Sequence, residues 1–159
     1  MHSLVTAPTL IEQVELARIH AAGQLNPARR AELGQFFTPA PLAQLMGALL
    51  PGSQRHVSLL DAGAGVGSLL SAGVEALANA PEPPQAIEVT AYEIDPALLP
   101  YLRQTLQRCQ ELCEARQIAF CSRVIEQDFI AHAVERIGMP VSYTHLDVYK
   151  RQTQFLAAL

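Results

Sequence analysis

A glycine-rich stretch between two apolar runs constrains the fold of this 159-residue chain more than any other feature. The stretch reads LLDAGAGVGSLL from Leu59 to Leu70, and it places Asp61 before glycines at positions 63, 65 and 67. Glycines at the end of a strand let the backbone approach a ligand closely, and a helix that starts there offers unpaired N–H groups. The stretch therefore predicts a strand, a ligand-binding turn and a helix.

The segments around this turn alternate between strand-like and helix-like patterns. Strands are predicted over residues 57–63, 86–94 and 118–125, from short β-rich runs and from alternation of apolar residues. Helices are predicted over 68–80 and 96–116, the second with a proline in its first turn. This alternation predicts an α/β fold in which about three parallel strands carry helices on both faces.

Helical segments precede the first strand. Thr9 is the predicted N-cap of a helix of about four turns, because Glu12 completes a capping box and apolar residues recur at helical spacing. Shorter helices are predicted over 27–33 and 40–50, on either side of the loop GQFFTPAP. The chain therefore begins with helices and continues as an alternating α/β unit.

The C-terminal tail differs in composition from the rest of the chain. Its segment VSYTHLDVYKRQ, residues 141–152, holds the only lysine and two of the four tyrosines. Written back into codons, residues 140–152 can form an inverted repeat that resembles the transposase mosaic end used in sequencing libraries. The alternative is a natural C-terminal strand and helix. We expect an artefact, and we divide the chain into a helical segment over 1–55, an α/β domain over 56–140 and a tail over 141–159.

Composition and charge argue against several classes of function for the residues present. The formal net charge is -4, which argues against a dominant nucleic-acid surface in this chain. The three cysteines form no disulfide framework, and the five histidines lack ligand spacing, so no metal site is predicted. No apolar run approaches the length of a membrane span, and the N-terminus lacks the pattern of a signal peptide. We therefore expect a cytoplasmic protein with no membrane partner.

The spacing of glycines and acidic residues favours one nucleotide ligand over others. Dinucleotide-binding folds use G-x-G-x-x-G with an acidic residue about 20 positions later. Here the pattern is G-x-G-x-G, and the next acidic residue at a strand end is Glu93. No lysine follows the glycines, as a P-loop requires. Because Asp61 can face an ammonium group and Glu93 can bind a ribose, the pattern favours S-adenosylmethionine over NAD.

Three motifs in this order resemble those of one enzyme family. LLDAGAGVGSLL and AYEIDP resemble motifs I and II of class I methyltransferases. GQFFTP resembles motif X, which precedes them in the adenine-N6 DNA methyltransferases of restriction-modification systems. The resemblance extends over residues 29–129. It implies an incomplete Rossmann-like sheet that binds S-adenosylmethionine, and it implies methyl transfer to adenine N6 in DNA.

The resemblance also implies which residues contact the methionine end of the cofactor. The side of the methionine would be lined by four residues of the GQFFTP motif: Phe36, Phe37, Thr38 and Pro39. An aromatic face there would lie near the sulfonium cation, and we expect one of the two phenylalanines to serve packing alone. The amino-acid portion would face Asp61 and the backbone at three glycines: Gly63, Gly65 and Gly67.

At the nucleoside end, the resemblance implies four further contacts. Glu93 would accept hydrogen bonds from both ribose hydroxyls, with Ile94 against the adenine. The alternative for Glu93 is a solvated turn. Asp128 would accept a hydrogen bond from the adenine amino group and Phe129 would pack on the ring, although the same pair is equally consistent with a helix cap.

The chain departs from the family in one large respect. Adenine-N6 methyltransferases carry an Asn/Asp-Pro-Pro-Tyr/Phe motif that binds the flipped base, and this chain contains no such tetrapeptide. We therefore expect the catalytic residues and the DNA-recognition region to lie beyond Met139, in sequence that this chain lacks, and we expect the chain itself to be inactive. Double-stranded DNA and a companion restriction endonuclease are the partners implied. The first strand would then have a free edge, which Val141, Tyr143 and Leu146 of the tail are suited to cover.

Two other functions remain open at this stage. The chain could be part of a methyltransferase that acts on RNA or protein, because related active sites accept other planar amides and amines. It could also be a non-catalytic S-adenosylmethionine-binding module that serves as a regulatory or specificity subunit. The substrate rests on the family resemblance alone.

Overall fold

The core of the protein is a small parallel sheet. The computed structural model describes residues 8–25, 35–50, 54–137 and 156–157. The sheet order is β3-β2-β1-β4, and the three parallel strands are β1 (His56–Asp61), β2 (Ala86–Tyr92) and β3 (Ala119–Ile125). Helices α4 (Ser68–Ala78) and α5 (Leu99–Ala115) connect them in chain order. The predicted incomplete Rossmann-like sheet is confirmed.

The outer edge of β1 is covered by two residues near the C-terminus. β4 (Leu156–Ala157) pairs antiparallel with Leu59 and Leu60 of β1. The tail thus takes the edge at which we expected it, but through other residues. The three residues that we considered suited to this edge, Val141, Tyr143 and Leu146, lie outside the described part of the chain.

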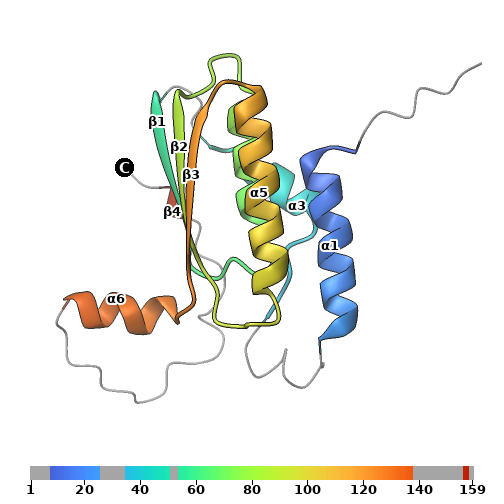
Figure 1. Ribbon diagram of the computed structural model, residues 1–159, viewed down its shortest axis with the longest axis vertical. Coiled ribbons are helices and arrows are strands. Elements are labelled where there is room, and N and C mark those ends of the chain that lie inside the picture. Colours follow the sequence, from blue (N-terminus) through green and yellow to red (C-terminus); the bar gives the residue numbers. More distant parts are fainter. Residues whose placement is uncertain (1–7, 26–34, 51–53, 138–155, 158–159) are drawn as a thin grey trace, which may run out of the picture.

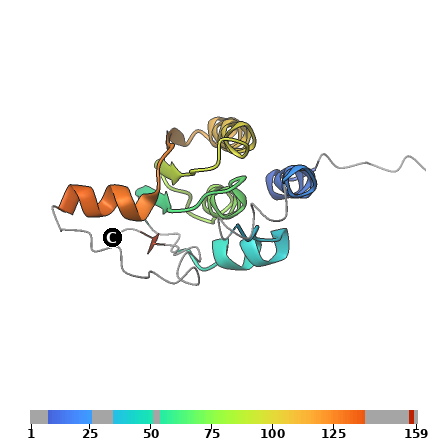
Figure 2. The same cartoon turned by 90° about the horizontal axis from the view of Figure 1, so that it is seen from below.

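The helices are distributed unevenly over the two faces of the sheet. α4 and α5 lie against one face. α1 (Leu10–Gln24) packs outside both of them, and α3 (Ala40–Gly47) packs beside α4, on the side away from α5 (Figures 1 and 2). α6 (Phe129–Ile137) lies on the opposite side, at one end of the sheet. On that second face Ser58, Glu88 and Cys121 lie in register across the strands, and all three are exposed. In the described residues, helices cover one face of the sheet as predicted, whereas the second face carries only α6 at one end.

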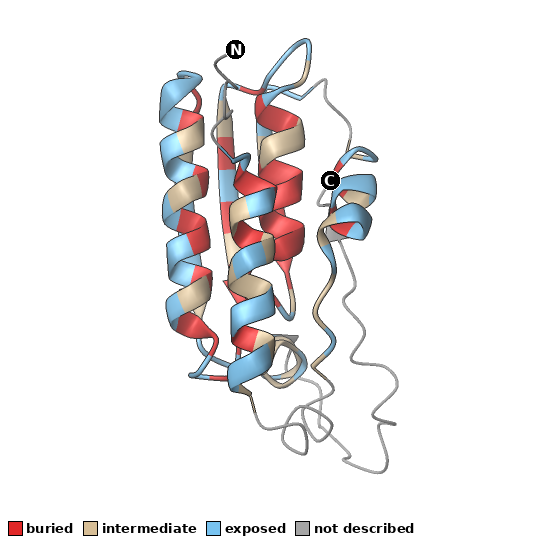
Figure 3. Cartoon of the chain, turned by 90° about the vertical axis from the view of Figure 1, so that its right-hand side faces the viewer, coloured by how far each residue is buried: buried red, intermediate tan, exposed pale blue. Residues whose placement is uncertain are grey.

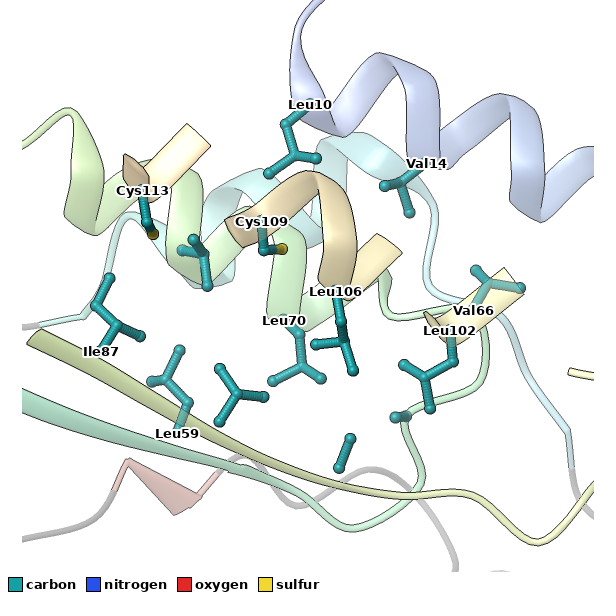
Figure 4. Close-up of a cluster of buried hydrophobic side chains, with 14 of the residues drawn as sticks. Leu10, Val14, Leu59, Val66, Leu70, Ile87, Leu102, Leu106, Cys109 and Cys113 are labelled. Atoms are coloured by element: carbon teal, nitrogen blue, oxygen red, sulfur yellow. The ribbon is translucent and has the colours of Figure 1, made fainter. Parts of the chain in front are cut away.

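The hydrophobic core lies between the covered face and the helices. Leu59 and Ile87 of the strands belong to the same cluster as Leu70 of α4 and Leu102 of α5; Ile87 lies at the end near Cys113, and Leu102 lies at the end near Val66 (Figure 4). Burying a leucine or isoleucine side chain contributes roughly 1.5–3 kcal/mol. Nearly every residue of α4 is buried, because this helix lies between the sheet and the outer helices (Figure 3).

The two cysteines of α5 belong to this core. Cys109 and Cys113 are free and buried. Burial raises the pKa of both thiols, to about 11 for Cys113, because the apolar surroundings disfavour the thiolate. They are therefore thiols at neutral pH and form part of the packed core, whereas Cys121 on β3 is exposed.

Most element boundaries follow the sequence pattern, with one instructive shift. Thr9 caps α1 through the predicted capping box with Glu12. α5 begins at Leu99 rather than at Pro96, because the Asp95 carboxylate accepts a hydrogen bond from the Ala97 N–H at 3.0 Å and holds a separate turn. α3 and α4 end at Gly47 and Ala78, slightly earlier than predicted. The helix predicted over 27–33 lies outside the described residues.

Carboxylates of one helix cap the start of another. The N–H of Leu10 donates to Glu75 Oε1 at 3.2 Å, and the N–H of Ala40 donates to Glu15 Oε2 at 3.1 Å. α3 also lies very close to α4, since a Cβ built on Gly47 would be 2.7 Å from the carbonyl oxygen of a residue in α4. These contacts fix the start of α3, and with it the end of the preceding FFTP segment. None of the described helices is long and apolar enough to cross a membrane.

Candidate functional site

The glycine turn joins the end of β1 to α4. Gly65 and Gly67 have φ values of 57° and 87°, in the left-handed region that favours glycine. A Cβ on Gly67 would also lie 2.8 Å from the Thr105 side chain of α5. The Ala64 N–H donates to the Tyr92 carbonyl at 2.8 Å and ties the turn to the end of β2. Local geometry therefore requires two of the three predicted glycines.

Gly63 has a different environment from the other two glycines. A Cβ built there would meet no atom within 4 Å. The space beside Gly63 is therefore open on the side of the turn where a bound group would approach the backbone.

Asp61, the last residue of β1, has a buried carboxyl group. It is 2% exposed, and its Oδ1 accepts a hydrogen bond from the Gly63 N–H at 3.2 Å. Burial raises the pKa of Asp61 to about 6; the bond from Gly63 opposes this rise, and the nearby charge of Glu93 adds to it. The carboxyl group therefore takes up a proton easily near neutral pH, and a positively charged ligand group would favour its ionised form.

Glu93 lies just beyond the end of β2. Its carboxylate accepts two backbone hydrogen bonds of 2.7 Å, from the N–H of Gly65 to Oε2 and from the N–H of Asp95 to Oε1. Burial raises the pKa of Glu93, and these two bonds partly offset the rise. Glu93 is 7% exposed, which excludes the alternative of a solvated turn. Ile94 beside it is half exposed, as a residue that packs on a ligand can be.

The FFTP segment lies across the glycine turn. Phe36, Phe37 and Thr38 line a cavity of about 30 Å³ together with seven residues from β1 to α4: Asp61, Gly63, Ala64, Gly65, Val66, Ser68 and Leu69. Such a volume has room for about one or two waters. The FFTP segment thus forms one wall of the cavity, and the glycine turn forms another.

The two phenylalanines have different surroundings. Phe36 is 81% exposed, whereas Phe37 packs against the core and its ring lies 3.6 Å from a Cβ built on Gly65. Both residues are among those that line the cavity, and the expectation that one of them serves packing alone stays a prediction. Pro39 is exposed and is the N-cap residue of α3.

Asp128 and Phe129 lie at the start of α6. Asp128 Oδ1 accepts a hydrogen bond from the Ala131 N–H at 2.8 Å, which is the geometry of a helix cap. The ring of Phe129 meets the edge of Tyr92, with ring centroids 5.1 Å apart. Neither residue is among the described residues that line the cavity. The contacts thus match the helix-cap alternative, and the role of this pair toward adenine stays a prediction.

Sequence reasoning missed two residues of the site. Gln35 Nε2 donates to Asp95 Oδ2 at 2.8 Å, and this bond joins the GQFFTP loop to the end of β2. Each residue belongs to a motif that the sequence singled out, GQFFTP and YEIDP. Gln35 and Asp95 are polar residues at the edges of those motifs, and that position was the signal that could have identified them as site residues.

The chemistry of the site suits a ligand with a cation and hydroxyl groups. Two buried carboxyl groups, Asp61 and Glu93, lie beside an open glycine backbone, and an aromatic side chain is exposed next to them. No basic side chain is among the described lining residues. An unpaired buried carboxylate is unfavourable, and a ligand ammonium would relieve that unfavourable burial at Asp61. These features fit S-adenosylmethionine.

Comparison with known proteins supports the same family. The chain is 34% identical over 125 residues to the type II methyltransferase M.PstI of Providencia stuartii, a match that covers 78% of this chain and 24% of that protein. It is 35% identical over 127 residues to the type II methyltransferase M.BsuBI of Bacillus subtilis, covering 78% of this chain and 23% of that protein. The chain thus spans about a quarter of the length of these curated relatives. No family model and no solved structure matches. The similarity to type II methyltransferases agrees with the methyltransferase motifs of the sequence.

Proposed function

We propose that this chain is the cofactor-binding part of a type II DNA methyltransferase that transfers a methyl group from S-adenosylmethionine to adenine N6. The observation that carries the proposal is the meeting of three motifs. The FFTP segment and the glycine turn line one cavity, and the N–H of Gly65 in that turn donates to Glu93 at the end of β2. Similarity to two proteins named type II methyltransferases supports the DNA substrate. The whole protein would act in the cytoplasm, with a companion restriction endonuclease.

Each group of the site has a task in this proposal. The Asp61 carboxylate binds the ammonium group of the cofactor, and Glu93 accepts hydrogen bonds from the ribose hydroxyls through the lone pairs that its backbone partners leave free. Phe36 and Phe37 cover the methionine side and exclude water from it. Ile94 contacts the adenine. The cofactor, when bound, supplies a methyl group on a sulfonium ion.

Calorimetric titration of the folded chain with S-adenosylmethionine tests the site. We expect Glu93→Ala and Asp61→Ala each to weaken binding by about 1 to 3 kcal/mol, because each removes a charged hydrogen-bond partner. Glu88→Ala is the matched control, since Glu88 is an exposed acidic residue on the same strand. Unchanged affinity in both site variants, or tighter binding of NAD than of S-adenosylmethionine, would overturn the assignment.

The substrate needs a separate test, because this chain contains no N-P-P-Y tetrapeptide. The uninterrupted gene should encode an N-P-P-Y or related motif downstream of the α/β domain, followed by a basic region. The protein expressed from that gene should methylate adenine in DNA. Methylation of RNA or protein instead would favour the second enzyme class, and an intact gene without the motif would favour a non-catalytic subunit.

A further inference from the structure

A closed ring of contacts joins three segments, two of which line the cavity. Gln35 donates to the Asp95 side chain at 2.8 Å, and the Asp95 N–H donates to Glu93 at 2.7 Å. Glu93 accepts the Gly65 N–H at 2.7 Å, and the ring of Phe37 lies against Gly65. Phe37 leads back along the chain to Gln35. We call these five residues the contact ring; it links the GQFFTP loop, the glycine turn and the end of β2.

One link of the contact ring is made by side chains alone. The Gln35 amide must turn its Nε2 toward the carboxylate of Asp95, since its Oε1 would be repelled there. Its Oε1 is buried and finds no hydrogen-bond partner among the described residues. A buried acceptor without a partner offsets much of the stability that the Nε2 bond contributes. Gln35 therefore adds little net stability, while its bond to Asp95 still determines where the loop lies.

We propose that Gln35 is a positioning residue of the cofactor site, which holds Phe36 and Phe37 over the glycine turn through Asp95. The proposal deepens the proposed function and rests on it. Phe36, Phe37 and Thr38 form the side of the cavity that faces the glycine turn, so their position determines the shape that a ligand meets. The hydrogen bond from Gln35 to Asp95 holds the start of this segment in that position.

An exchange of donor and acceptor tests this link. Gln35→Glu places two carboxylates against each other, and we expect it to weaken S-adenosylmethionine binding by about tenfold or more. Asp95→Asn keeps an oxygen for the Ala97 N–H and serves as the reference for the double variant. In Gln35→Glu/Asp95→Asn the introduced amide donates to the introduced carboxylate. Affinity should then return to within about threefold of Asp95→Asn. Gln44→Glu, at an exposed position of α3, controls for added charge.

A second measurement needs no cofactor. Chymotrypsin cleaves after phenylalanine, so mass spectrometry of brief digests reports how often the chain opens at Phe36 and Phe37. We expect cleavage there to rise severalfold in Gln35→Glu and to fall again in the double variant, with the urea midpoint of each variant measured alongside. If the double variant is no better than Gln35→Glu in either measurement, the proposal is wrong. A different result is that cleavage rises in Gln35→Glu and falls again in the double variant while the wild-type chain fails to bind S-adenosylmethionine. That result would support the positioning role of Gln35 and contradict the proposed function.

Discussion

Asp61→Asn should stabilise the ligand-free protein at alkaline pH. The substitution keeps the shape of the side chain, and the amide oxygen can still accept the hydrogen bond from the Gly63 N–H. It removes a carboxyl group that is 2% exposed and lies near Glu93. The new amide N–H₂ can donate toward that neighbouring carboxylate. The main change is therefore the loss of a buried negative charge.

The size of the effect follows from the pKa of Asp61. Its value rises from 3.8 to about 6 on folding, and one pKa unit corresponds to about 1.4 kcal/mol. Because the folded state holds the proton more tightly, burial of Asp61 lowers the free energy of unfolding as pH rises from about 4 to about 6. The loss reaches about 3 kcal/mol at pH 8 and is about half of that at pH 5. The free energy of unfolding of Asp61→Asn should therefore exceed that of wild type by about these amounts at each pH.

Urea unfolding at pH 5 and pH 8 measures the effect. The difference in free energy of unfolding between Asp61→Asn and wild type should be larger at pH 8, and Glu88→Gln, an exposed control, should show no such dependence. The same variant should bind S-adenosylmethionine more weakly, so that stability and affinity change in opposite directions. A variant that gains no stability between pH 5 and pH 8 relative to wild type would refute the reasoning.

Three further predictions concern other parts of the molecule. Glu15→Ala removes the carboxylate that caps α3 at Ala40, and it should lower the free energy of unfolding by about 0.5–2 kcal/mol in urea titrations. Gly67→Ala should destabilise the protein by at least about 1–2 kcal/mol in the same assay, because φ is 87° and a Cβ would be 2.8 Å from Thr105. The 159-residue chain should transfer no methyl group to DNA above background, since it lacks the N-P-P-Y motif; labelled S-adenosylmethionine and mixed DNA provide the test.

The parts of the fold that local patterns specify could be predicted from the sequence. The strands, the capping box at Thr9 and the turn through Gly65 and Gly67 each follow from residues close together in the chain. The start of α5 was misplaced because the side chain of Asp95 forms its own turn with the residues after it. The competition between that turn and the first helical turn is not visible in apolar periodicity.

Long-range contacts account for the rest of what was missed. Gln35 and Asp95 are 60 positions apart, so no local pattern links them. The open second face of the sheet did carry a signal, because Glu88 and Thr90 alternate with apolar residues on β2 as in a strand with one solvated face. The docking of α3 determines whether Phe36 or Phe37 packs against the core. Because the two residues are identical neighbours, the sequence cannot distinguish them.

The docking of α3 on α4 also decides how firmly the FFTP segment is held at its Pro39 end. Gly47 lies so close to Ala72 that a Cβ would be 2.7 Å from its carbonyl oxygen, and a carboxylate of α1 caps the first turn of the same helix. The FFTP segment is thus anchored through Pro39 to a helix that cannot shift easily. Its Gln35 end is tied, in the part of the chain described, by one side-chain hydrogen bond to Asp95. The two ends of the segment are therefore held in different ways: the packing of a helix fixes the Pro39 end, and a hydrogen bond between two side chains ties the Gln35 end to the end of β2.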